Sequence, residues 1–158
     1  MTLKKNQRGL YVIEFAIISV VMFTVLLGAI ELARLVWVVN TIEEATHRGA
    51  RLAAVCPIDD SSIPEVTVFN SPGGGSASPI VNGLTTSSVD VKYLASDGLT
   101  TTTTFEDVRY VRVSINCAGC TQFTFNPLIP FFDTGFPLPT IESTLPSESL
   151  GYVPDSSP

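Results

Sequence analysis

The chain has 158 residues, a formal net charge of −6, 45% hydrophobic residues and only 15% charged residues. The charge is divided by position, because Lys4, Lys5 and Arg8 precede an apolar run whereas eleven acids and three bases follow Leu52. Nucleic-acid binding requires clustered Lys and Arg, so this acidic part excludes nucleic acid as an expected partner. The apolar run and its continuation take up the first third of the chain, and the remaining residues, about one hundred, are enough for one small domain.

Residues 10–30 form an apolar run of 21 residues in which Glu14 is the one charge. A helix of that length crosses a hydrocarbon core of about 30 Å. Positive charge before such a span marks the cytoplasmic side, which predicts a cytoplasmic N-terminus and an exported acidic part. A cleaved secretory signal is the alternative. The length of the run, and the lack of an A-x-A-like site at its end, favour a retained anchor.

The helix pattern continues well past the membrane length. No proline occurs between Leu10 and Pro57, and proline ends helices because it lacks an N–H. Such a helix is about 69 Å long, more than twice a bilayer, so its second half is expected to protrude. From residue 40 to residue 55, apolar and small residues recur at helical spacing, which predicts a face that packs on a domain. Trp37 is placed either at the outer membrane interface or between packed helices.

The sequence after Pro57 predicts a small antiparallel sheet of three to five strands, one face of which the protruding helix covers. Ser-Asp-Gly at 96–98 predicts a turn, and the Gly-rich stretch 71–79 predicts a flexible loop. Residues 111, 113, 115 and 117 share one parity, which predicts a buried face. The strand candidates are β-prone or alternating segments, namely residues 65–69, 89–95, 100–104, 111–117 and 140–145.

The residues at the start of the apolar run resemble a known processing site. Arg8 and Gly9 precede Leu10, and Glu14 is the fifth residue counted from Leu10. This arrangement is similar to that of type IV prepilin-like proteins, in which cleavage after a glycine leaves a glutamate fifth in the mature chain. Here Leu10 stands where pilins often begin with Phe or Met.

The longer pattern resembles the TadE-like family of pseudopilins in the Flp/Tad pilus system. The family's Gly-x-x-Glu-x-x-Arg segment is matched at residues 28–34, and its Gly-Ala-Arg-x-Ala-Ala segment at residues 49–54. A weaker similarity is the Phe-Asn-Pro-Leu-Ile-Pro segment at 125–130. Residues 8–55 carry most of the resemblance.

The resemblance implies a non-enzymatic minor pilin or pseudopilin of a Tad-type pilus assembly system, cleaved by a prepilin peptidase between Gly9 and Leu10. Its partners would be the inner membrane, other pilins or pseudopilins and Tad assembly proteins, without a cofactor. The implied location is the bacterial inner membrane, single-pass, with the C-terminal domain periplasmic or incorporated in a pilus. The alternatives are a membrane-anchored extracytoplasmic module that binds a ligand or surface, and an anchored redox enzyme.

The expected fold class is α+β, with one N-terminal transmembrane helix that extends into a pilin-like long helix packed on a small antiparallel sheet. The expected parts are a cytoplasmic leader at 1–9, a transmembrane helix at 10–34, an extracytoplasmic amphipathic helix at 35–56, a β-rich head at 57–146 and a disordered tail at 147–158.

Three charged residues on the helix are the assembly candidates. Glu14 is costly inside a bilayer without a partner. If Leu10 carried a new α-ammonium, Glu14 of the next subunit could neutralise it; otherwise Glu14 reaches the cytoplasmic headgroups. Glu31 and Arg34 are spaced i, i+3 and can pair. They mark the outer hydrocarbon boundary, with Arg34 reaching the headgroups, or they set the register between neighbouring helices.

The cysteines are expected in an oxidising compartment, where pairs become disulfides. A bridge from Cys56 to Cys117 would tie the helix to the sheet and contribute up to about 4 kcal/mol. A local bond from Cys117 to Cys120 is the competitor. Redox catalysis by this CxxC would need its first cysteine at a helix N-terminus, whereas strand-like residues surround it here. Zinc would need His47 together with all three cysteines.

Other catalytic or metal-binding patterns are sparse. His47, the single histidine, lies on the expected long helix, and the sequence shows neither a recognisable Ser/His/Asp set nor a nucleotide-binding loop. The adjacent acids at 59–60 and 106–107 are expected in solvated turns, where a weak calcium site is the remaining alternative. We therefore expect no catalytic residue, no metal and no cofactor.

Overall fold

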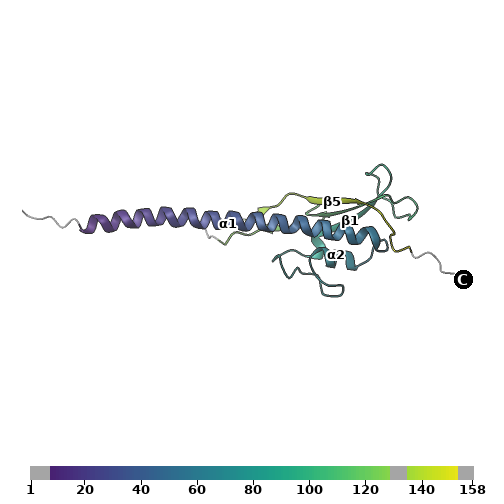
Figure 1. Ribbon diagram of the computed structural model, residues 1–158, viewed down its shortest axis with the longest axis horizontal. Coiled ribbons are helices and arrows are strands. Elements are labelled where there is room, and N and C mark those ends of the chain that lie inside the picture. The colour runs from purple at the N-terminus through teal and green to yellow at the C-terminus, as the bar shows by residue number, and fades with distance from the viewer. Residues whose placement is uncertain (1–7, 129–134, 153–158) are drawn as a thin grey trace, which may run out of the picture.

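A computed structural model describes residues 8–128 and 135–152 of the chain. Helix α1 (Arg8–Val55) has 48 residues and runs the length of the molecule, with a small head around its C-terminal half (Figure 1). We call residues 11–30 the exposed half of α1 and residues 35–55 its covered half. The helix is long and apolar enough, by length and composition, to cross a membrane.

The head contains two small antiparallel sheets. The larger sheet has the strand order β1-β2-β5, and the smaller one pairs β3 with β4. Their bounds are β1 (Val89–Leu94), β2 (Tyr110–Ile115), β5 (Ile141–Pro146), β3 (Thr124–Phe125) and β4 (Phe136–Pro137). A single 3-10 turn, η1 (Thr86–Ser88), leads into β1. The expected α+β class, a long apolar helix packed on a small antiparallel sheet, is confirmed.

The central strand β2 faces the covered half of α1. Val111, Val113 and Ile115 are all fully buried, as their shared parity predicted. They contact small and apolar residues of the helix, among them Ala53 and Ile42. Alternation of apolar and polar residues puts one face of a strand into a core, and here that core is the helix.

Helix α2 (Ser62–Thr67) packs on another side of α1, beside β1, so that the covered half lies between α2 and the sheet (Figure 1). The contact with α1 is so close that a Cβ added at Gly49 would overlap the Thr67 side chain. The neighbouring residues Ala45, Ala50 and Ala53 are also fully buried. Small residues at these positions allow the backbones to approach.

The expected strand at 65–69 is wrong, because that segment contributes to α2. Ile63 and Thr67 lie one helical turn apart, so both fall on the face of α2 that is buried. The Asp60 carboxylate accepts a hydrogen bond from Ser62 N at 2.8 Å at the start of the turn. Pro64 lies in the first turn, where the missing N–H costs nothing.

The expected strand at 100–104 is also wrong. Only Thr101 forms a bridge, to Leu94, and Thr102 N donates to Tyr93 O at 2.9 Å. The threonines of this run are largely exposed, so β-propensity has no packed face to reinforce it. The predicted turn at 96–98 is present, with Gly98 at a φ of +68°.

The disordered tail expected at 147–158 is wrong for residues 147–152. Glu148 N and Leu150 N donate to Ala54 O, and Gly151 N donates to Val55 O at 2.7 Å. These carbonyls belong to the last turn of α1, where no further helical N–H can reach them. Leu150 is only 6% exposed, so the segment closes the end of the helix and seals the core there. Residues 153–158 of the expected tail lie outside the described residues.

Candidate assembly surface and its junction with the head

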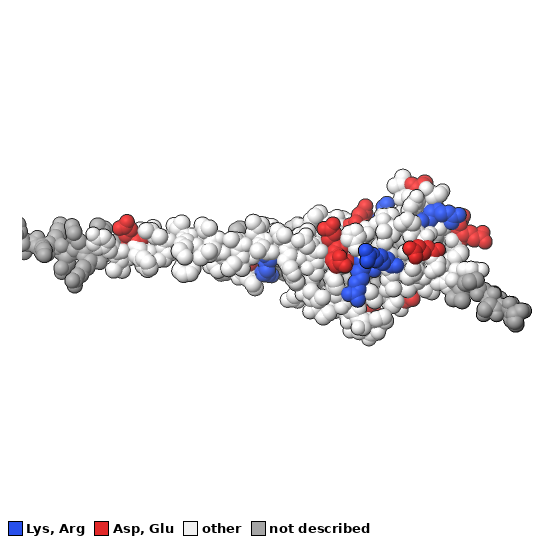
Figure 2. All heavy atoms as spheres, in the orientation of Figure 1, with Lys and Arg blue, Asp and Glu red and all other residues white. Residues whose placement is uncertain are grey.

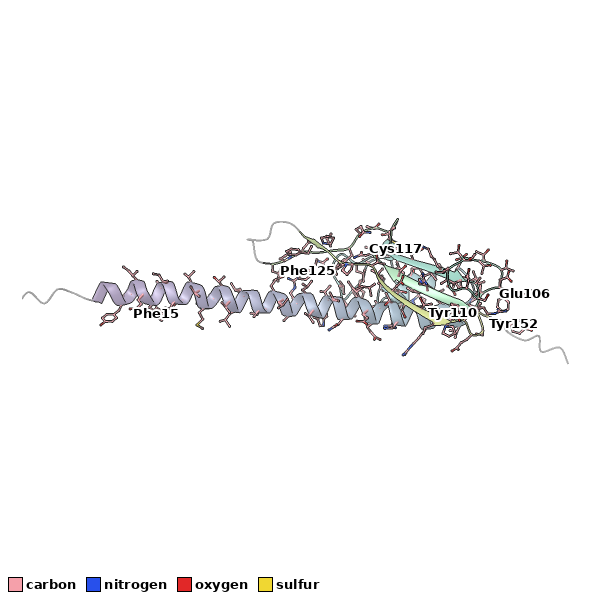
Figure 3. The ribbon with its side chains drawn as sticks, turned by 90° about the horizontal axis from the view of Figure 1, so that it is seen from above. Phe15, Glu106, Tyr110, Cys117, Phe125 and Tyr152 are labelled. Carbon is pink, nitrogen blue, oxygen red and sulfur yellow. A yellow bond between two sulfur atoms is a disulfide. The ribbon has the colours of Figure 1, made fainter. Side chains whose placement is uncertain are left out.

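The exposed half of α1 presents large apolar side chains to the surroundings on every side. Its Tyr, Phe, Met, Val, Leu and Ile residues from Tyr11 to Ile30 are between 45% and 72% exposed. Figure 2 shows this half as almost entirely uncharged, and Phe15 projects freely from it in Figure 3. A continuous apolar surface of this extent is not stable in water, so it requires lipid, other helices or both.

Glu14 lies on this apolar surface and is exposed. It has no hydrogen-bond or ion-pair partner among the residues whose side chains the structure describes. An isolated carboxylate at this depth is unfavourable in hydrocarbon. The described side chains of one chain therefore do not supply the partner that the position requires. The backbone of Gly9 and Leu10, the two sides of the expected cleavage, is already helical.

Gly28 differs from Gly49 in its surroundings. A Cβ added at Gly28 would meet nothing within 4 Å, whereas one at Gly49 would overlap Thr67. Packing within the chain thus explains the glycine of the Gly-Ala-Arg segment but not the glycine of the Gly-x-x-Glu segment. Gly28 has no contact within the chain and lies on a helix apolar enough to cross a membrane, so it fits a site where another helix approaches closely.

Glu31 and Arg34 pair as their spacing predicted, with 2.6 Å between Arg34 Nη1 and Glu31 Oε1. The structure adds contacts to the head that the sequence could not indicate. Arg34 Nη2 donates to Asn126 O at 3.2 Å, and Leu128 N donates to Glu31 Oε1 at 3.3 Å. The guanidinium also lies 4.8 Å from the centroid of the Phe125 ring, within cation–π range.

We call this set of contacts the junction clamp. Its two charged side chains are partly covered, with 13% of Glu31 and 35% of Arg34 exposed. The clamp fixes the head to the helix one residue beyond the apolar run, so the head cannot slide along α1 without breaking it. Arg34 thus contacts the head, in addition to the place at the hydrocarbon boundary that the sequence predicts for it.

A cavity of about 400 Å³ lies beside the junction clamp, between the helix and two loops of the head. Arg34 and Trp37 line it from the helix, and Ile80 and Leu128 line it from the loops. Arg34 is the one charged residue among the described residues that line it. Trp37 is 52% exposed and therefore does not belong to the buried core.

The preferred disulfide from Cys56 to Cys117 is wrong. Cys117 is bonded to Cys120, and Cys56 is free. The bonded pair closes a turn between β2 and β3, in which Gly119 has a φ of +98°. Since a strand follows this turn in place of a helix, the pair lacks the helix N-terminus that lowers the pKa of a redox-active cysteine.

The direction of β2 along α1 explains why the preferred bridge does not form. Cys56 packs in the cluster that contains Val111, whereas Ile115 packs with Ile42, about four turns earlier on the helix. The strand therefore carries Cys117 away from the end of α1. Parity correctly predicted that Cys117 is buried, but parity does not indicate which end of a strand meets which end of a helix. Burial raises the pKa of the Cys56 thiol, and the Asp60 carboxylate raises it further.

Asn116 organises this part of the head and was missed by the sequence analysis. It adopts a left-handed backbone with a φ of 61°, which asparagine tolerates better than most residues. Its side chain accepts a hydrogen bond from Phe123 N at 2.6 Å and donates to Phe123 O and Leu138 O. Thr140 Oγ1 donates to its carbonyl at 2.8 Å. A single buried amide thus connects the end of β2 with the chain before β3 and the chain before β5.

His47, the only histidine, is on the exposed side of the covered half, and its Nδ1 lies 2.9 Å from Ser143 Oγ. The contact ties α1 to β5. Within residues 8–128 and 135–152, no group of three or more His, Cys, Asp or Glu side chains is arranged to hold a metal ion.

Comparison with known proteins gives a match for the N-terminal part of the chain only. No curated protein and no solved structure matches the chain. Residues 9–51 match the family model described as TadE-like protein, and this span contains Glu14, the junction clamp pair and Gly49. The weaker similarity at 125–130 lies outside the matched span, and residues 129 and 130 lie outside the described residues. Together with a helix able to span a membrane, the match indicates a membrane-anchored component related to the Tad pilus. The resemblance to the TadE-like family is thereby confirmed for the N-terminal helix.

Proposed function

We propose that the protein is a minor pilin or pseudopilin of a Tad-type pilus assembly system, inserted in the bacterial inner membrane with a cytoplasmic N-terminus. It acts by packing its exposed half against the helices of other subunits, and its head stays on the extracytoplasmic side. The observation that carries the proposal is the apolar, exposed half of α1, which lies within the segment matched to the TadE-like family. It contains one carboxylate, Glu14, that has no partner among the described side chains.

Cleavage between Gly9 and Leu10 would supply the missing partner of Glu14. Hydrolysis of that peptide bond leaves a positively charged α-amine on Leu10. In the cleaved chain the amine lies at the first residue and Glu14 at the fifth. If a neighbouring helix is shifted along the bundle by that spacing, the amine of one subunit meets the Glu14 carboxylate of the next. The pair neutralises two charges in a medium where each alone is costly.

Mass spectrometry of the membrane-extracted chain tests the processing step. In a host with a prepilin peptidase we expect a chain that begins at Leu10, and in the same host without the peptidase an uncut chain. Gly9→Leu should block cleavage because a bulky side chain cannot enter a tight protease cleft with the backbone extended. A chain that keeps residues upstream of Leu10 in the presence of the peptidase would refute this step.

Substitution of Glu14 tests assembly separately from processing. Glu14→Gln preserves the shape of the side chain and removes its charge, so we expect a stable membrane protein that fails to co-purify with other pilus subunits. Glu44→Gln is the matched control, since Glu44 is exposed on the covered half, within the head-bearing part of α1. Equal co-purification by both variants would contradict a role for Glu14. Binding of the head to a separate ligand, the alternative function, would be unaffected by either substitution.

A further inference from the structure

The end of the head that faces the exposed half of α1 bears four apolar side chains that remain exposed. They are Trp37, Ile80, Leu128 and Phe136, with exposed fractions of 52%, 47%, 75% and 46%. We call them the basal surface. Trp37 lies on α1, and the other three lie on separate loops or strands of the head, so the surface is assembled only by the fold.

Several contacts fix the basal surface at the level of the junction clamp. Leu128 N bonds to Glu31 Oε1, and Ile80 lines the same cavity as Arg34 and Trp37. Phe136 pairs with Phe125, whose ring lies under the Arg34 guanidinium. In Figure 3 Phe125 lies at the end of the head next to the exposed half of α1, whereas Glu106 and Tyr152 lie at the opposite end.

The helix sets the depth of this surface, provided that α1 spans a membrane as proposed above. An apolar run that ends at Ile30 fills a hydrocarbon core of about 30 Å and leaves Glu31 at its edge. Because Leu128 is hydrogen-bonded to Glu31 itself, the basal surface is held at that edge. The apolar surface of the exposed half and the basal surface therefore meet at the junction clamp.

The chemistry of the basal surface matches the lipid headgroup region. Aromatic and aliphatic side chains beside an arginine are favoured where hydrocarbon meets water. The Glu31 carboxylate nearby is paired with Arg34 and only 13% exposed, so it does not oppose approach to anionic lipids. Exposed acids such as Asp97 and Glu106 belong to loops of the head remote from the clamp, with Glu106 at the far end in Figure 3.

We propose that the basal surface is a second membrane contact, by which the head rests on the outer face of the bilayer that α1 crosses. The lipid headgroup and upper acyl region is its occupant. The contact holds the head against the bilayer until the subunit leaves it.

Tryptophan fluorescence in vesicles with brominated acyl chains tests this contact, since bromine quenches only indole that reaches it. Trp37 is the single tryptophan, so Trp37→Phe provides a blank background. Into it we would introduce Leu128→Trp on the basal surface and Leu99→Trp on a remote loop, two leucines that are 75% and 78% exposed. Phe23→Trp in the exposed half reports membrane insertion itself. Ile80→Trp is a second probe of the basal surface, which remains usable if the Leu128→Trp variant does not fold.

The expected result is strong quenching and a blue shift at positions 23, 128 and 80, with several-fold less quenching at position 99. Quenching at 23 together with no more quenching at 128 and 80 than at 99 would overturn the basal contact and leave the membrane-spanning helix intact. A blue shift at 128 without bromine quenching would also overturn it, in favour of a contact between protein subunits. Absence of quenching at 23 would refute the membrane-spanning helix and the basal contact together.

Discussion

The two halves of α1 have similar secondary structure and opposite packing. The covered half buries alanines, a glycine and Ile42 against the sheet and α2, and its exposed side carries charges. The exposed half carries large apolar side chains on all sides and buries none of them within the chain. In one continuous helix, the apolar face of one half is thus buried within the chain, whereas the apolar surface of the other half needs external partners to cover it. Substitutions should therefore affect folding in one half and assembly in the other.

The largest expected effect comes from truncating a buried isoleucine. Ile42 is fully buried and packs with Ile115, so Ile42→Ala should reduce the free energy of unfolding of the head by about 2–5 kcal/mol. Denaturant titration of the detergent-solubilised chain, followed by near-ultraviolet circular dichroism, measures it. Ile17→Ala is the control, since Ile17 is 61% exposed in the exposed half. Similar losses for both variants would contradict the division of the helix.

The two family glycines give the next comparison. Gly49→Ala forces a methyl group against Thr67 and should cost about 1–3 kcal/mol of head stability, measured by the same titration. Gly28→Ala has free space around its Cβ and should leave head stability unchanged while weakening recovery of subunit complexes. If Gly49→Ala were neutral, α1 and α2 would not be in the close contact described.

Loss of the junction clamp should be smaller and local. Arg34→Met removes the bond to Asn126 O and the contact with Phe125, and it leaves Glu31 without its cation. We expect about 1 kcal/mol of local destabilisation, or roughly fivefold faster hydrogen exchange at the Leu128 amide. Arg34→Lys keeps the charge but not the planar donor pair, so it should restore only part of the protection. Unchanged exchange in Arg34→Met would show that the head is fixed to the helix by other contacts.

The smallest expected effect concerns Asp97, in the loop that follows β1. Its carboxylate accepts a hydrogen bond from the Thr100 hydroxyl, and others from Leu99 N and Thr100 N, which lowers its pKa from 3.8 to about 2. Because the folded pKa lies below the unfolded one, this stabilisation is present above pH 3.8 and is lost as the pH falls toward about 2.

Carboxyl NMR titration measures the pKa of Asp97 directly. Thr100→Ala should raise it, since the hydroxyl donor is removed, and Thr103→Ala should leave it unchanged. A pKa at the ordinary aspartate value in the unsubstituted chain would show that the loop hydrogen bonds do not persist in solution. Neither variant should change assembly through the exposed half.

The sequence predicted those features that depend on local periodicity. The length of α1 followed from the absence of proline up to Pro57, and β1, β2 and β5 followed from alternation in segments that pack on a core. The i, i+3 spacing of Glu31 and Arg34 correctly predicted their pairing. Gly9, Glu14 and Gly28 carried the family resemblance because their positions are fixed relative to one another along one helix.

The features that were missed depend on contacts between distant segments. Six residues form α2 because Ile63 and Thr67 find a surface on α1, which no local pattern reveals. The cysteine pairing depended on the direction of β2 along the helix, and residues 147–152 are ordered because carbonyls at the end of α1 need donors. Asn116 offered a weak signal, an asparagine at the end of a strand, but its role depends on where Phe123 and Leu138 return to the core.

Carbodiimide cross-linking between subunits tests the central claim most directly. The reagent joins a carboxylate to an amine that is in contact with it, and a mixture of nitrogen-14 and nitrogen-15 labelled chains distinguishes links between subunits from links within one. The account predicts a mixed-isotope peptide in which the Leu10 α-amine is bonded to Glu14 of another subunit, absent in Glu14→Gln. A chain that assembles fully in the membrane without such a peptide, with Glu14 unmodified or linked only within its own chain, would contradict it.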